Sequence, residues 1–133
     1  MPKVRVLVVD DHPIVRLSVC SILSQEPTLD VICQTTDGED AVIKAHELQP
    51  DVILLDISLP GISGIEAARQ IGKVSPNSRI LFLSQHDTVQ MADEALKAGG
   101  YGYVTKGEAA LELLTAVRTV SRGDRFVSSR IDA

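Results

Sequence analysis

Two runs of the chain, 51–55 (DVILL) and 79–83 (RILFL), are apolar on both alternating faces. A strand with one face in solvent alternates apolar and polar residues, whereas a strand covered on both faces does not. Parallel strands covered in this way need crossover connections, which are usually helices. These two runs therefore constrain the chain to an α/β fold built around a buried parallel sheet.

Shorter apolar runs complete a set of five predicted strands, at 4–9, 30–35 and 101–104. Helical patterns follow the strands, over 13–24, 38–48, 63–72, 88–98 and 108–122. Pro13 suits the first turn of a helix, Asp37 and Ser63 suit N-caps, and Gly123 suits a helix end. The chain is thus a series of five strand–helix units.

Right-handed crossovers leave few topologies for such a series. We predict a flavodoxin-like (βα)5 doubly wound parallel sheet with strand order 2-1-3-4-5. In the last helix, Leu111, Leu114 and Val117 are expected to face the core. The domain is expected to span 1–122, and the polar segment 123–133 is expected to begin a linker to an absent C-terminal domain.

Composition narrows the class of protein further. The 133 residues and the 44% hydrophobic share suit one domain with its own core. The net charge of −5 argues against this chain gripping a nucleic-acid backbone by itself. No apolar run approaches the length of a membrane span, and Cys20 and Cys33 lie in no metal-ligand motif. We expect a cytoplasmic protein with two unpaired thiols and no membrane partner.

Polar residues stand where the predicted central strands end. Asp10 and Asp11 follow the first strand, Asp56 the third, Ser84 the fourth and Lys106 the fifth. In an open α/β sheet, ligands bind beyond the carboxyl ends of the strands, at the switch in strand order. Clustered carboxylates need a compensating positive charge, and a hard cation such as Mg²⁺ suits an all-oxygen site. A metal, an ammonium and a hydroxyl there predict a site for a phosphoryl group, with Asp56 as the nucleophile.

Each of these residues has an ordinary structural explanation on its own. Asp10 or Asp11 could cap a helix, Asp56 could be solvated, Ser84 could belong to a turn, and Lys106 could be a surface charge. Only their convergence on one edge of the sheet favours a functional site. For His12 we favour an exposed loop imidazole over a phosphohistidine or a metal ligand.

The order and spacing of four motifs resemble the receiver domain of a bacterial two-component response regulator. The resemblance covers about residues 3–122 and rests on "VLVVDDHP", "DVILLDISLPGISGIEA", "ILFLS" and "GYGYVTK". It implies that Asp56 is the phosphoacceptor, and that Asp11, Asp56 and the Ser58 backbone carbonyl hold Mg²⁺ (or Mn²⁺). Asp10 would assist through water.

The resemblance also implies a switch. Ser84 would be the hydroxyl that turns toward the phosphoryl group, Tyr103 the aromatic that moves inward with it, and Lys106 the cation that binds the phosphoryl oxygens. Ser58 and His86 would tune the lifetime of the phosphate. The family often has proline directly after the lysine, whereas this chain has Gly107.

The stretches "VVDDHP", "PGISGIEAAR" and "VRTVSRGDRFVSS" resemble the LuxR-type subclass. The subclass implies phosphorylation by a sensor histidine kinase and transcriptional control through a helix-turn-helix DNA-binding domain, which is absent here. A homodimer would use the region 87–104 or the helices at 13–24 and 108–122. In that region Val89, Met91 and Ala95 suit either a dimer face or ordinary helix packing.

Three other functions compete with this regulatory one. A haloacid-dehalogenase-type phosphatase needs a second aspartate two residues after its nucleophile, whereas here Asp10 and Asp11 are adjacent and position 12 is His12. A binding module that is never phosphorylated would not need Asp11, Asp56, Ser84 and Lys106 together. A flavodoxin-like nucleotide carrier would need a phosphate-cradling loop where the chain has "DDHP".

Overall fold

The computed structural model describes residues 3–129 and 131. Its core is one parallel sheet with strand order β2-β1-β3-β4-β5-β6. The strands are β1 (Val4–Val9), β2 (Leu29–Thr35), β3 (Val52–Leu55), β4 (Arg79–Ser84), β5 (Gly100–Thr105) and β6 (Phe126–Val127). The predicted flavodoxin-like order 2-1-3-4-5 is confirmed, and β6 extends it beside β5.

The helices begin close to the predicted signals. They are α1 (Pro13–Ser24), α2 (Gly38–Leu48), α3 (Gly64–Val74), α4 (Val89–Lys97) and α5 (Ala109–Ser121), with a 3-10 turn, η1, at Lys106–Glu108. Asp37 caps α2 by accepting from the Asp40 amide at 2.7 Å, and Ser63 caps α3 in the same way. These caps fix where each helix leaves the edge of the sheet that carries the polar residues.

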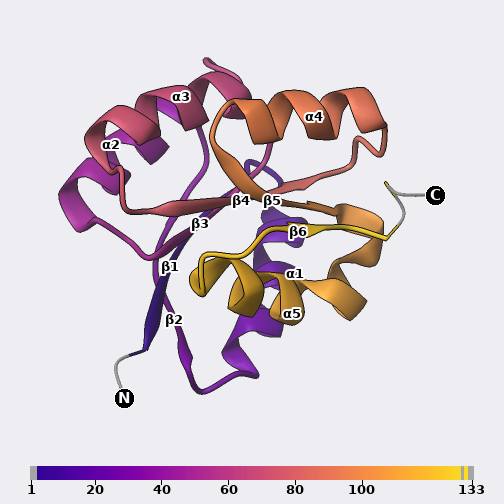
Figure 1. Cartoon of the computed structure of the whole chain (residues 1–133). Coiled ribbons are helices and arrows are strands. Elements are labelled where there is room, and N and C mark those ends of the chain that lie inside the picture. The colour runs from indigo at the N-terminus through magenta and orange to yellow at the C-terminus, as the bar shows by residue number, and fades with distance from the viewer. Residues whose placement is uncertain (1–2, 130, 132–133) are drawn as a thin grey trace.

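Two helical layers cover the sheet (Figure 1). Helices α2, α3 and α4 lie on one face, and α1 and α5 lie on the other. Alternate residues of each strand supply the two cores: Leu7 of β1 packs under the first layer, and Val6 and Val8 pack under the second. Burial on both faces explains why the central strands are apolar throughout.

The inward face of α5 differs from the prediction. Leu111 is 82% exposed, whereas Leu113 and Val117 are fully buried. Leu111 is two residues from Leu113, which places it about 200° around the helix and away from the sheet. Leu114 is half-buried, so the prediction is right for Val117 and wrong for Leu111.

In the polar segment 123–133, the described residues 123–129 and 131 extend past the expected boundary at residue 122. Phe126–Val127 pairs with β5 as a sixth parallel strand, and Ile131 is buried. The carboxylate of Glu112 on α5 accepts hydrogen bonds from Ser128 and Ser129. Residues 130, 132 and 133 of this segment lie outside the described residues.

Candidate functional site

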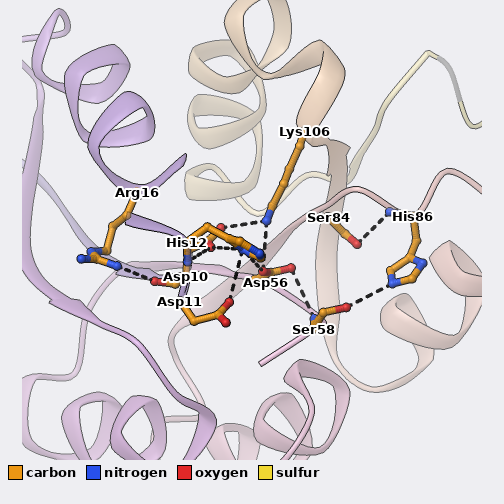
Figure 2. A network of polar contacts seen from close by, with 9 residues as sticks. All are labelled: Asp10, Asp11, His12, Arg16, Asp56, Ser58, Ser84, His86 and Lys106. Carbon is orange, nitrogen blue, oxygen red and sulfur yellow. Dashed lines mark hydrogen bonds and ion pairs between the residues drawn. The ribbon is translucent and has the colours of Figure 1, made fainter. Parts of the chain in front are cut away.

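The carboxyl ends of four neighbouring strands bring the predicted polar residues together (Figure 2). Asp10 and Asp56 directly follow β1 and β3, Ser84 ends β4, and Lys106 follows β5. Asp10, Asp56 and Ser84 are almost completely buried. The convergence expected from strand order is therefore present in the folded chain.

Lys106 is the fixed cation of the site. Its Nζ lies 3.1 Å from Asp10 Oδ2 and 3.1 Å from Asp56 Oδ2. Its side chain is 14% exposed, so this charge is largely withdrawn from solvent. One ammonium between two buried carboxylates leaves the site with excess negative charge.

Burial dominates the titration of Asp56. Desolvation raises the pKa of its carboxyl above the ordinary value, and the negative charge of Asp10 adds to this rise. The hydrogen bond and charge of Lys106 oppose it without cancelling it. A further positive charge would therefore favour the ionised Asp56.

The donor atoms beside Asp56 fit a divalent cation. Asp10, Asp11, His12 and Asp56 each offer one ligand atom, and these atoms lie within 4.8 Å of one another. The buried oxygen Asp11 Oδ1 accepts no hydrogen bond from any residue that the structure describes. Clustered carboxylates with an unsatisfied oxygen suit a hard cation, so the residues present could hold a metal ion.

His12 is an exposed loop residue, as predicted, but its ring lies in direct contact with the site. Its side chain is 51% exposed, but the ring turns toward the carboxylates, with Nδ1 3.1 Å from Asp10 Oδ1 and 3.3 Å from Asp11 Oδ1 (Figure 2). Neither aspartate caps α1, whose N-cap is His12 itself. Asp10 Oδ1 instead accepts from the His12 amide at 2.9 Å. The sequence signal for this was the position of His12 directly after the aspartate pair.

Arg16 of α1 contributes to the site, although it was not among the predicted site residues. Its Nη1 donates to the backbone carbonyl of Asp10 at 2.9 Å. This contact ties the first turn of α1 to the end of β1 and so holds the loop that carries Asp11. Arg16 belongs to no motif in the sequence. The only signal is its position, one helical turn after the loop that carries Asp11.

Ser58 and His86 meet across the site. Ser58 Oγ lies 3.2 Å from His86 Nε2, and the Ser58 amide donates to Asp56 Oδ1 at 3.3 Å. The two residues come from the loops after β3 and β4, so their contact bridges one side of Asp56 (Figure 2). The two predicted tuning residues are therefore direct partners.

The predicted switch pair is linked through the backbone of His86. The amide of His86 donates to Ser84 Oγ at 3.1 Å, and Tyr103 Oη donates to the His86 carbonyl at 2.8 Å. Tyr103 is fully buried, which raises the pKa of its phenol. Tyr103 already lies inward in this structure.

Two features of the fold and site define a class of protein. The chain is a flavodoxin-like α/β domain, and its acidic, lysine-bearing, metal-competent site lies at the switch in strand order. The family model described as the response regulator receiver domain matches residues 6–118. The chain belongs to this family.

Individual relatives agree with this assignment. Response regulator GacA of Pseudomonas viridiflava is 38% identical over 128 residues, which cover 96% of this chain and 60% of that protein. Response regulator UvrY of Escherichia coli K12 is 37% identical, and the match covers 96% of this chain and 59% of that protein. The chain thus spans about 60% of the length of these curated relatives.

A solved structure shows the same fold. A two-component response regulator of the LuxR family from Aurantimonas sp. SI85-9A1 superposes with a TM-score of 0.94 at 35% identity. The match covers 98% of this chain and 93% of that one. The fold and family predictions, including the LuxR-type subclass, are confirmed.

Across residues 3–129 and 131, no helix is both long and apolar enough to cross a membrane.

Proposed function

We propose that this receiver domain is a phosphorylation switch that accepts a phosphoryl group on Asp56 from the phosphohistidine of a sensor histidine kinase. The observation that carries the proposal is the buried Asp56 carboxylate, held 3.1 Å from Lys106 Nζ among further carboxylates. A structural ion pair would need only one carboxylate. The surplus negative charge suits a site completed by a metal ion and a phosphoryl group.

In the transfer, an oxygen of Asp56 attacks phosphorus in line with the phosphohistidine nitrogen. The new P–O bond forms as the P–N bond breaks, and the electron pair returns to the imidazole, which takes up a proton. The product is an aspartyl phosphate. Lys106 Nζ lies 3.1 Å from the Asp56 carboxylate, where it offsets the charge of the incoming phosphoryl group.

The residues that would hold Mg²⁺ (or Mn²⁺) are Asp11, Asp56 and the Ser58 backbone carbonyl, with Asp10 acting through water. The bound ion would neutralise carboxylate and phosphoryl charge. Lys106 Nζ contacts both Asp10 and Asp56 and would add its fixed charge to that of the ion.

The switch would start at Ser84. Its Oγ accepts from the His86 amide, and the His86 carbonyl accepts from Tyr103 Oη. When Ser84 turns to donate to a phosphoryl oxygen, it releases that amide and disturbs the loop before α4. The region 87–104 then shifts between two states, and its affinity for partners changes.

The family places the domain in a regulatory role. We propose that its own chemistry is limited to its phosphorylation and dephosphorylation. A phosphatase of the haloacid-dehalogenase type would need an aspartate where His12 stands. Steady turnover of a phosphomonoester by this chain would contradict the proposal.

An apolar groove beside the site is the surface we propose for the histidine kinase. It has a volume of about 270 Å³ and runs from α1 to η1, with Ile14, Val15, Lys106 and Gly107 among its lining residues. Ile14 is 82% exposed, so an apolar side chain stands free next to the phosphoryl site. A helix that carries the phosphohistidine could pack here and reach Asp56.

The proposed partners beyond the kinase are DNA and a second copy of this chain. We propose that DNA is bound only through a C-terminal domain outside this chain, because the net charge here is −5.

A homodimer would use the region 87–104 or helices α1 and α5. In the first of these regions Val89 is exposed, whereas Ala95 is buried and Met91 packs on the core. Only Val89 of these three is free for a dimer face.

The test is phosphorylation with acetyl phosphate and Mg²⁺, followed by intact mass, alongside binding of beryllofluoride followed by NMR. The wild type should gain one acid-stable, hydroxylamine-sensitive phosphoryl group, and Asp56→Asn should gain none. Asp30→Asn removes an exposed aspartate on β2 and should behave as the wild type. Modification that persists in Asp56→Asn would disprove the acceptor assignment.

A further inference from the structure

His12 completes a ring of donor atoms around the acidic site. Its Nδ1 lies 3.1 Å from Asp10 Oδ1, 3.3 Å from Asp11 Oδ1 and 3.8 Å from Asp56 Oδ2. Three carboxylates thus surround one ring nitrogen, and Figure 2 shows the imidazole turned into the group. One Nδ1–H can donate a well-aligned hydrogen bond to only one of these oxygens.

These three spacings fall between those of adjacent and opposite ligands of one metal ion. In an octahedral site with metal–ligand distances of about 2.1 Å, adjacent ligands lie about 3.0 Å apart and opposite ligands about 4.2 Å apart. The four donor atoms of Asp10, Asp11, His12 and Asp56 all fall within 4.8 Å of one another. Asp11 Oδ1, which faces His12 Nδ1, accepts no hydrogen bond from the described residues.

The backbone holds His12 in this place. Its amide donates to Asp10 Oδ1 at 2.9 Å, and Pro13 starts α1 directly after it. Arg16 secures the same loop by its bond to the Asp10 carbonyl. The ring therefore has a short, tethered approach to the carboxylates, although half of its surface is open to solvent.

We propose that His12 Nδ1 is a nitrogen ligand of the divalent cation that this site binds, and that it shifts the preference of the site from Mg²⁺ toward Mn²⁺ and later transition metals. Imidazole is a poor ligand for Mg²⁺ and a good one for borderline ions, whereas carboxylates serve both. The inference rests on the cation site of the proposed function and adds a ligand to it.

Pulsed EPR of bound Mn²⁺ tests the ligand directly, because a coordinated imidazole gives a ¹⁴N coupling. The chain has three histidines, so the source can be assigned by substitution. We expect the coupling in the wild type and in His46→Gln, which changes an exposed histidine of α2, and also in His86→Gln. We expect it to disappear in His12→Gln. A missing coupling in the wild type, or one that survives in His12→Gln, would overturn the inference.

Calorimetric titration tests the preference. His12→Gln should weaken Mn²⁺ binding by about tenfold and Mg²⁺ binding by less than about threefold. An equal loss for both ions would contradict a ligand role. If Asp56 is still phosphorylated with Mg²⁺ while Mn²⁺ shows no nitrogen coupling, only this inference fails. If no divalent ion binds, or if Asp11→Ala binds as the wild type, the proposed cation site fails with it.

Discussion

Asp56 is 2% exposed, and its burial raises the pKa of its carboxyl although Lys106 Nζ lies 3.1 Å away. A pKa above the ordinary value of 3.8 means that the folded state holds the proton more tightly than the unfolded state does. The penalty is absent below pH 3.8 and grows as the pH rises through the folded pKa. Above that pKa the ionised Asp56 destabilises the metal-free domain.

Asp56→Asn should therefore stabilise the metal-free domain at neutral pH, by about 1 kcal/mol or more, a size typical of single stabilising changes. The gain should shrink as the pH falls toward 3.8, where Asp56 is protonated in both states. Urea unfolding with a chelator, over a series of pH values, measures it. Asp30→Asn, on the exposed side of β2, should show no such gain. A loss of stability in Asp56→Asn at neutral pH would contradict this account.

The contact between Ser58 and His86 should control how long the phosphate lasts. Ser58 Oγ and His86 Nε2 lie 3.2 Å apart across one side of Asp56, where we expect their contact to narrow the approach of water. Ser58→Ala and His86→Ala should each speed hydrolysis of the aspartyl phosphate. The double variant should be about as fast as the faster single variant, because both changes break one contact. Loss of ³²P over time measures the rates, and fully additive effects would show that the residues act separately.

Much of the site follows from the sequence because parallel strands bring their carboxyl ends to one edge. Asp10, Asp56, Ser84 and Lys106 could be placed together from strand order alone. The direction of the His12 ring could not be predicted, since it depends on three carboxylates from two strands. The roles assigned to Ser84 and Tyr103 stay predictions, to be tested by the NMR response to beryllofluoride.

Among the elements, α3 begins close to the Asp56 backbone, and Gly64 makes that approach feasible. A Cβ on Gly64 would lie 2.0 Å from the backbone carbonyl oxygen of Asp56. The Gly64 amide donates to the Ile57 carbonyl at 2.8 Å, so the start of the helix is tied to the loop after β3. The backbone, unlike a flexible side chain, cannot move aside cheaply.

Gly64→Ala should destabilise the domain by about 1–3 kcal/mol and slow phosphorylation of Asp56, because relief of the clash moves the Asp56 loop. Gly72→Ala is the matched control in the same helix, where a Cβ would meet nothing within 4 Å. It should stabilise by about 0.5–1 kcal/mol and leave phosphorylation unchanged. Urea unfolding and the acetyl phosphate reaction measure the two effects. Similar behaviour of both variants would contradict the close-approach argument.

The elements also show which features sequence patterns can predict and which they cannot. β3 and β4 were predictable because both faces of each are apolar, and the helix starts because Asp37 and Ser63 cap them. β6 has only two residues and lies in a polar segment. Its pairing with β5, rather than a pattern in its own sequence, makes it a strand. Leu111 was wrongly assigned to the buried face because more than one set of leucines at helical spacing fits α5. Only packing against the sheet selects the face that buries Leu113.

At the scale of the whole molecule, hydrogen bonds join the site to the segment that contains β6. The Ser128 amide donates to the Tyr103 carbonyl at 2.8 Å, and Thr105 Oγ1 lies 3.5 Å from Ser128 Oγ. Thr105 directly precedes Lys106, and Tyr103 bonds to the loop of His86. A change at the phosphoryl site can therefore reach β6 through β5. Glu112 is the side chain that fastens this segment to α5.

Glu112→Gln should loosen the segment in a pH-dependent way. Partial burial acts to raise the pKa of Glu112, but hydrogen bonds from Ser128 and Ser129 outweigh it and lower the pKa below its ordinary value of 4.5. The charged carboxylate therefore stabilises the fold above pH 4.5, and this contribution is lost as the pH falls through the folded pKa. At neutral pH the substitution should cost about 0.5–1 kcal/mol, since solvent screens a partly exposed carboxylate.

Two measurements separate this fastening from a general loss of stability. In Glu112→Gln, hydrogen exchange should speed up at the amides of Ser128 and Ser129 more than at those of β1 and β3, which lie far from the segment. Ser128→Ala combined with Glu112→Gln should cost less than the two single changes added together, because both remove the same contact. Uniform exchange across the sheet, or full additivity, would mean that Glu112 does not hold the segment. In that case the link from Lys106 to β6 would run through β5 alone, by way of the bonds that Tyr103 and Thr105 make to Ser128.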